Sequence, residues 1–199
     1  MIWPKAYLSH TQFQMWKRSP KTYIEQYWKN GRKFTSREMA FGSRVADSIE
    51  NNEETGDPLL DLVIEYLPKL DIAEFPLECV LKGSDIEVPF FGKLDHAKTD
   101  LSAFREFKTG RTKWNQRIVD EDEQITWYCM LIYIITKKIP NDIILAHAPT
   151  EKDDDGRVIA TGDVFEYRTH RNIGQVLNMM VQARRVWREI GEACEAELI

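Results

Sequence analysis

With 199 residues, the chain is long enough to bury one substantial hydrophobic core, and no Gly/Ser/Pro-rich linker divides it, so we expect a single domain over residues 1–199. Its formal net charge of −5 argues against a protein that coats nucleic acid nonspecifically. The amino terminus lacks an apolar signal-peptide core, and the longest apolar stretch, Ile125 to Ile135, is far shorter than the ~20 residues of a membrane span. These features predict a cytoplasmic protein that makes no membrane contact.

Capping residues and hydrophobic periodicity predict the secondary structure. Ser9 begins a capping box, and Pro20 suits the first turn of a helix. In chain order we expect helices at about residues 10–17, 20–29, 36–51 and 58–67, strands at 73–82, 86–98 and 102–109, a helix at 120–137, a strand at 142–149, an extended segment near 157–168, and a helix at 171–197.

The two strands at 86–98 and 102–109 are predicted to form an antiparallel hairpin, because the four residues at 99–102, Thr-Asp-Leu-Ser, supply turn chemistry. With a two- or four-residue loop, the numbers of paired residues sum to 201. Asp95 then faces Glu106, with the side chains about 5 Å apart. A three- or five-residue loop would break this register.

Lys108 lies two residues after Glu106 and therefore shares its face of the strand, whereas Phe107 points the other way. Two carboxylates at this spacing repel each other by roughly 3 kcal/mol at an effective dielectric constant near 20. A hard divalent cation between Asp95 and Glu106 would remove that repulsion. The alternative is a surface cluster in which Lys108 or Lys93 neutralises the acids.

Several motifs occur around this hairpin in a characteristic order. They are Tyr7-Leu8-Ser9-His10-Thr11-Gln12-Phe13 with Ser19-Pro20-Lys21-Thr22-Tyr23, the segment Phe41 to Glu50, Gly92-Lys93-Leu94-Asp95, Glu106-Phe107-Lys108-Thr109-Gly110, and Gln124-Ile125-Thr126-Trp127-Tyr128. Together they resemble the RecB-type branch of the PD-(D/E)XK nuclease superfamily, which includes bacterial helicase-nuclease domains and small phage recombination exonucleases. The resemblance implies an α/β fold with a restriction-endonuclease-like αβββαβ core, whose mixed central sheet is flanked by N- and C-terminal helices.

The resemblance also implies roles for the residues of the hairpin. Asp95 and Glu106, with the main-chain carbonyl of Phe107, would bind Mg²⁺ or Mn²⁺. Lys108 would orient the attacking water or stabilise the charge that develops on the phosphate.

Gln124 and Tyr128 lie four residues apart and therefore on one helical face. By resemblance they would support the catalytic site or hold the phosphate backbone. Taken without the resemblance, a buried tyrosine with a glutamine one turn away is more often structural.

One position departs from the family pattern. The family usually has a metal-binding histidine where this sequence has Ala46. Glu50, one turn further along the same face, is the expected replacement, and Asp47 is the adjacent but differently directed option. His10 and His96 are expected to be solvated or structural, since His96 follows Asp95 on a strand and so faces away from it.

Three isolated cysteines, Cys79, Cys129 and Cys194, form no metal-binding pair, and we expect reduced thiols that are mostly buried. Some RecB-type nucleases hold an iron-sulfur cluster with four cysteines, one of them at the position of Ser19. Only Cys194 lies near the other three family positions, so no iron-sulfur cluster is expected.

A basic and aromatic segment follows the second strand of the hairpin. Its members, predicted to bind nucleic acid, are Arg111, Lys113, Trp114 and Arg117. Trp114 could stack on a base for ~1–3 kcal/mol, and the cations could contact phosphates. The alternative is an ordinary solvated loop.

The leading hypothesis is a metal-dependent DNA nuclease, an exonuclease or end-processing enzyme of a phage-like recombination or repair system. A catalytically inactive DNA-binding or scaffold member of the same fold is the second hypothesis, which the departure at Ala46 permits. An enzyme of small phosphoesters is the third, and it is weakened because the chain has no Gly-rich phosphate-binding loop. No ATPase motif is present, so a recombinase, annealing protein or helicase would act in trans.

Overall fold

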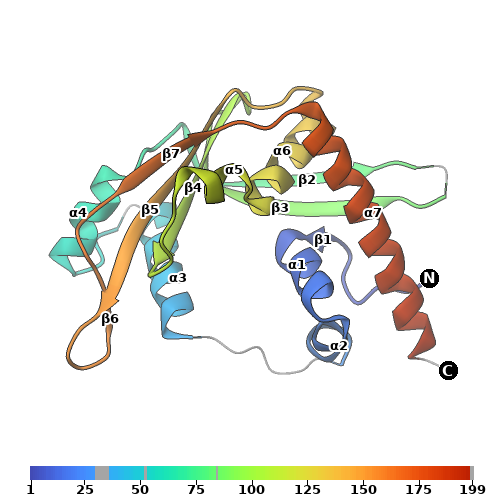
Figure 1. Ribbon diagram of the computed structural model, residues 1–199, viewed down its shortest axis with the longest axis horizontal. Coiled ribbons are helices and arrows are strands. Elements are labelled where there is room, and N and C mark those ends of the chain that lie inside the picture. Colours follow the sequence, from blue (N-terminus) through green and yellow to red (C-terminus); the bar gives the residue numbers. More distant parts are fainter. Residues whose placement is uncertain (30–35, 52, 84, 198–199) are drawn as a thin grey trace.

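The computed structural model describes residues 1–29, 36–51, 53–83 and 85–197 (Figure 1). The strands in this part of the chain are β1 (Leu8–Ser9), β2 (Ile72–Leu81), β3 (Val88–Ala97), β4 (Ala103–Gly110), β5 (Asp142–Lys152), β6 (Val158–Ala160) and β7 (Phe165–Thr169). The helices are α1 (His10–Arg18), α2 (Pro20–Tyr23), a π-helix η1 (Ile24–Trp28), α3 (Arg37–Asn51), α4 (Pro58–Tyr66), α5 (Gln116–Asp120), α6 (Glu123–Thr136) and α7 (Ile173–Ala196).

The strands form one mixed sheet, as the sequence predicts. β3 pairs antiparallel with β2 and β4, β4 pairs parallel with β5, and β5 pairs antiparallel with β6 and β7. The short strand β1 adds parallel to β3. The parallel step from β4 to β5 is made through α6, the crossover helix that such a connection requires. The helix before β2, the three strands, α6 and β5 confirm the predicted order of the core.

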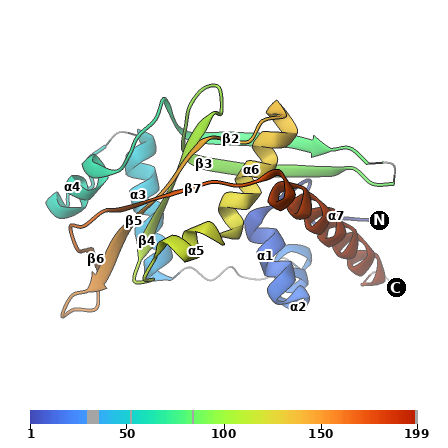
Figure 2. The same cartoon turned by 45° about the horizontal axis from the view of Figure 1, so that its top comes forward.

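Helices pack on the sheet in two groups. In Figures 1 and 2, α1, α2, α6 and α7 gather toward one end of the molecule, and α3 and α4 toward the other. The apolar middle of α6 is buried against the sheet and α7, as its sequence predicts, and the fully buried Trp127 packs against Phe13 and Phe90. A second, smaller cluster joins α3 and α4 to β5 and β6 through Phe41 and Leu60.

The structure differs from the predicted elements at several points. The helix expected at 120–137 is α6, which begins three residues later because Asp122 accepts a hydrogen bond from Ile125 N and caps it. The short helix α5 before it was not predicted. Asn115 caps α5 in the same way through Ile118 N. The strand β1 was not predicted, since two residues carry no period. No helix in the described ranges has the length and apolar character that a membrane crossing needs.

Candidate active site

The β3–β4 hairpin has the predicted register. Its paired residues are His96 with Arg105 and Ala97 with Phe104, and the chain turns through the four residues 99–102. Beyond these pairs the two strands separate, because the Asp95 carboxylate accepts a hydrogen bond from the backbone N–H of Phe107 at 2.5 Å. Asp95 and Glu106 therefore lie just beyond the last paired residues of the β3–β4 ladder.

Four side chains form a hydrogen-bonded row from β4 to α6. The Lys108 ammonium lies 2.5 Å from Glu106 Oε1 and donates to Gln124 Oε1 at 2.7 Å. Gln124 Nε2 in turn donates to the hydroxyl of Tyr128 at 2.9 Å. The structure thus brings together all five residues that the sequence analysis proposes as catalytic, the fifth being Asp95.

Gly92 explains how α6 comes close enough to complete this row. A Cβ atom at Gly92 would lie 2.7 Å from the Leu131 side chain and 3.1 Å from the Tyr128 ring. Any larger residue at position 92 of β3 would push α6 away from the sheet. The glycine of the Gly-Lys-Leu-Asp motif is therefore required for helix packing, three residues before the acid.

The two acids are electrostatically strained. Burial raises the pKa of Asp95 well above its ordinary value, and the Glu106 carboxylate raises it further. Burial likewise raises the pKa of Glu106, although the Lys108 ammonium acts in the opposite direction. Burial alone would lower the pKa of Lys108, but the two carboxylates outweigh it and the net shift is upward. Burial also raises the pKa of Tyr128, with Glu106 contributing, so its phenol stays protonated.

This arrangement fits a divalent cation. Glu106 is 2% exposed, and its Oε2 atom is buried without a hydrogen-bond partner, the kind of atom that a cation would satisfy. Over the described ranges of the chain, no three His, Cys, Asp or Glu side chains converge closely enough to hold a metal. A cation held here would take the carboxylates of Asp95 and Glu106, the carbonyl of Phe107, and water. Mg²⁺ accepts such a set, because it commonly retains several waters.

Glu74 is a further acid near Asp95 and Glu106, although the three carboxylates do not converge closely enough to hold a metal together, and the sequence analysis missed it. It lies on β2 opposite Asp95, between the pairs Ala73–His96 and Phe75–Leu94, and its φ of 49° is unusual for a residue other than glycine. The side chain is 6% exposed and forms an ion pair with Lys93. Strained backbone of this kind is found at functional sites. No sequence signal marks it, because a glutamate near the start of a predicted strand is ordinary.

The α3 helix forms the opposite wall of a cleft of about 380 Å³ over the hairpin. Gly42 allows close approach to β4, since a Cβ there would lie 3.3 Å from Thr109 Oγ1. Ala46 lines the cleft at the position where the family pattern has a histidine. Glu50 and Asp47 do not line it, and the Glu50 carboxylate lies 4.0 Å from the Lys93 ammonium. The assignment of Glu50 as a metal ligand therefore remains a prediction.

His10, His96 and the three cysteines lie outside the hydrogen-bonded row from Glu106 to Tyr128. His96 is buried, is within 3.3 Å of the Leu70 backbone through Nδ1, and packs on the Phe107 ring. Burial lowers the pKa of His10 to about 4, and its ring lies beside Trp127. The cysteines are free thiols, two of them buried and the third, Cys79, half-buried.

The basic segment after β4 is only partly exposed. Arg111, Lys113 and Arg117 are exposed, and Arg117 pairs with Glu121 at 3.2 Å. Trp114 is half-buried near His147, and its carbonyl accepts a hydrogen bond from a tyrosine hydroxyl of β7. Part of the Trp114 ring is therefore committed to packing, and the predicted nucleic-acid contacts of this segment remain a prediction.

No protein-family model matches the sequence, and no curated protein matches it. Among solved structures, a candidate exonuclease from Eubacterium rectale aligns with 96% of this chain and 82% of its own length, with a TM-score of 0.61 at 12% identity. The fold is nuclease-like. The protein SSO0001 aligns with 94% of this chain and 78% of its own at a TM-score of 0.49 and 9% identity. Candida albicans Rai1, crystallised with pU5 and Mn²⁺, aligns with 56% of this chain and 33% of its own at 0.26 and 12% identity. These last two similarities are too weak to inform the function.

Proposed function

We propose that this protein is a Mg²⁺- or Mn²⁺-dependent nuclease that hydrolyses phosphodiester bonds in DNA, acting as an exonuclease or end-processing enzyme in recombination or repair. The observation that carries the proposal is the unpartnered Oε2 atom of buried Glu106, whose other carboxylate oxygen lies 2.5 Å from the Lys108 ammonium and whose charge acts on Asp95. An arrangement of buried like charges costs stability unless a cation compensates it, so a function in binding a cation explains its presence.

The chain supplies three functions around such a cation, which would polarise the scissile phosphate and lower the pKa of a bound water. Asp95 and Glu106 would hold the ion, and the hydrogen bond from Phe107 N–H fixes the orientation of Asp95. Lys108 has three donors, of which Glu106 and Gln124 occupy two. The third is available for the attacking water or for a phosphate oxygen, where its positive charge stabilises the transition state.

Gln124 and Tyr128 act as positioning residues in this proposal. Because Gln124 accepts from Lys108 and donates to Tyr128, its amide orientation is determined at both ends. This holds the ammonium within the cleft rather than in solvent. Rigid placement of a charged group before the reaction is the main source of electrostatic catalysis.

The alternative is an inactive DNA-binding or scaffold protein with the same fold. Ala46 is the observation in its favour, because a methyl group faces the cleft where related nucleases have a ligand. The presence of Asp95, Glu106 and Lys108 together argues against the scaffold hypothesis, because a scaffold gains nothing from buried acids that repel each other.

A cleavage assay separates the two. Purified protein is incubated with end-labelled linear DNA and with covalently closed circular DNA, in Mg²⁺, Mn²⁺ or EDTA. We expect linear DNA to be degraded only with metal and circular DNA to survive. Glu106→Ala and Lys108→Ala should each abolish cleavage and keep a cooperative melting transition. Glu78→Ala and Lys138→Ala, which change exposed residues, are matched controls that should cleave normally. DNA that is bound but intact in Mn²⁺ would establish the scaffold instead.

A further inference from the structure

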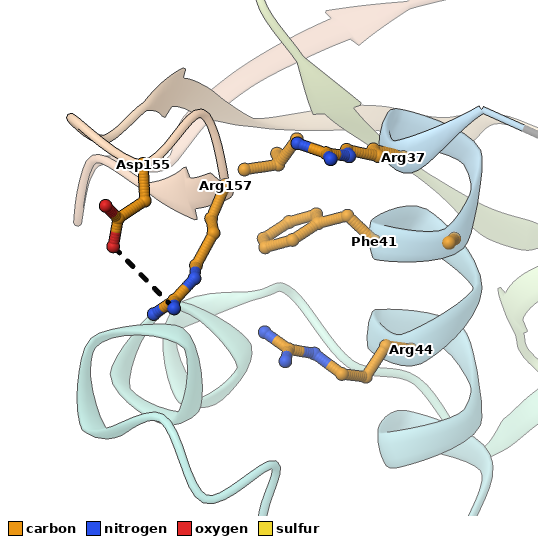
Figure 3. Close-up of a pocket in the computed structure, with 7 residues that line it drawn as sticks. Arg37, Phe41, Arg44, Asp155 and Arg157 are labelled. Atoms are coloured by element: carbon orange, nitrogen blue, oxygen red, sulfur yellow. Dashed lines mark ion pairs between the residues drawn. The ribbon is translucent and has the colours of Figure 1, made fainter.

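A second pocket lies beside the catalytic cleft, on the neighbouring face of α3. It has a volume of about 470 Å³ and is lined by Arg37, Ala40, Phe41 and Arg44 of that helix, by Asp155 and Arg157 of the β5–β6 loop, and by Val158 of β6. Figure 3 shows the side chains of Arg37, Phe41 and Arg44 projecting from the helix toward Asp155 and Arg157. Arginines thus reach the pocket from two elements more than 100 residues apart in the chain.

The positions of the helical residues explain the grouping. Residues 37, 41 and 44 are spaced by four and three, so they share one face of α3. The Arg44 guanidinium lies over the Phe41 ring, 5.5 Å from its centroid, which holds that cation beside an apolar floor. Arg37 donates to the carbonyl of Gly156 at 3.0 Å and so fixes the loop that carries Arg157.

The pocket is strongly basic in an acidic protein. Three arginines and one aspartate give its lining a formal charge of +2, whereas the whole chain carries −5. The acids near the pocket neutralise its arginines only weakly. Asp155 is 3.6 Å from Arg157 with both side chains mostly exposed, and Asp57 is 3.8 Å from Arg44. Asp57 is also occupied as the cap of α4. The guanidinium donors, five on each arginine, therefore exceed the acceptors available to them.

We infer that this pocket binds a phosphate group of the nucleic acid that is cut in the neighbouring cleft. Guanidinium groups bind phosphate through paired hydrogen bonds, and a terminal phosphate carries about −1.5 to −2 charges at pH 7, which matches the lining. The first turn of α3 adds the positive end of a helix dipole, with Ser36 capping it through Met39 N. This inference depends on the proposed function only in taking a nucleic acid as the ligand.

The arrangement relative to the cleft supports a shared ligand. Gly42, Val45, Ala46 and Ile49 of α3 line the catalytic cleft, and residues 37, 40, 41 and 44 line the pocket. The two are therefore separated by about one helix width, roughly 10 Å. A nucleic-acid strand whose terminal phosphate is held in the pocket would extend over α3 to the carboxylates of Asp95 and Glu106. Binding of the terminal phosphate would then orient the chain for cleavage near that end.

Equilibrium binding in EDTA tests this without any cleavage. Fluorescent single-stranded oligonucleotides with a 5′-phosphate, a 3′-phosphate or two hydroxyl ends are titrated with protein, and anisotropy gives the affinity. We expect one phosphorylated end to bind about tenfold more tightly than the hydroxyl form. Arg44→Gln and Arg157→Gln should each remove this preference. Asp155→Asn should strengthen it, because a competing carboxylate is lost.

Lys152→Gln is the matched control, because Lys152, at the end of β5, also forms an ion pair with α3, through Glu38 at 3.3 Å, but does not line the pocket. Thermal melting confirms that each variant is folded, and Arg37 is avoided because it also holds the loop. If all three oligonucleotides bind alike but the arginine variants weaken each of them and reduce the salt dependence, the bound group is a backbone phosphate.

Unchanged affinity and salt dependence in both arginine variants, for every oligonucleotide, would overturn the inference. This failure is distinct from failure of the proposed function. A protein that cleaves DNA but binds every oligonucleotide with the same affinity in the parent and in both arginine variants would lose only the phosphate pocket. A protein that never cleaves but recognises the end phosphate through Arg44 and Arg157 would keep the pocket and lose the nuclease.

Discussion

Replacement of Asp95 by asparagine should make the metal-free protein more stable than the parent. In the presence of metal, the same variant should be less stable than the parent. The pKa of Asp95 is raised by burial and by Glu106. A carboxyl group whose pKa is raised in the folded state favours folding below its ordinary value of 3.8, and this contribution is lost as the pH rises through the folded-state value. Above pH 3.8, where the unfolded chain ionises at this position, the raised pKa therefore costs the folded parent stability that the variant does not lose, although the amide oxygen of the new side chain could still accept from Phe107 N–H.

The magnitude follows from the spacing. Two carboxylates about 5 Å apart repel by roughly 3 kcal/mol at an effective dielectric constant near 20. The Lys108 ammonium, 2.5 Å from Glu106, cancels part of this. We expect Asp95→Asn to stabilise the metal-free protein by about 1–2 kcal/mol, which for a chain of this size raises the melting temperature by about 2–8 °C. Mn²⁺ at a hundredfold excess over its dissociation constant should stabilise the parent by about 2.7 kcal/mol and the variant far less.

Thermal unfolding followed by circular dichroism, at pH 8 in EDTA and again in Mn²⁺, tests this reversal. The variant should melt higher in EDTA and lower in Mn²⁺, and the EDTA difference should vanish near pH 4, close to the ordinary aspartate pKa. Glu78→Gln, an exposed acid of β2, should follow the parent in both buffers. A variant that melts lower than the parent in EDTA would refute the reasoning, because it would mean that the Asp95 carboxylate stabilises the metal-free fold.

Three other outcomes are expected. In calorimetric titrations with Mn²⁺, Glu74→Gln should lower the affinity more than Glu50→Gln does, because Glu74 lines the cleft and Glu50 does not. Asp47→Asn should change the affinity little. A larger loss of affinity in Glu50→Gln than in Glu74→Gln would support the ligand predicted from sequence. Gly92→Ala should destabilise the protein by ~1–3 kcal/mol, since the new Cβ would lie 2.7 Å from Leu131, and a denaturant midpoint equal to that of the parent would contradict the packing argument. The purified protein should be colourless, and a visible absorbance band bleached by dithionite would mean that the cysteine positions were misjudged.

Local periodicity was sufficient to predict the hairpin and the face that Glu106 and Lys108 share. Side chains alternate along a strand whatever the tertiary context, and a four-residue turn determines which residues face each other. The pairing of His96 with Arg105 therefore follows from the chain itself, as does the common face of Glu106 and Lys108. The start of α6 was also readable in principle, because Asp122 is a strong helix cap, but the acidic residues from Asp120 onward suit a first helical turn as well.

Tertiary packing decided the rest, because it depends on shapes that no local period records. The contact of Lys108 with Gln124 requires α6 to lie close to β3, which only the missing side chain of Gly92 permits. Glu74 enters the site through a kink in β2 and not through any motif. The pocket of Arg44 and Arg157 joins a helix to a loop 113 residues later, and such a pair meets only after the sheet has formed between them.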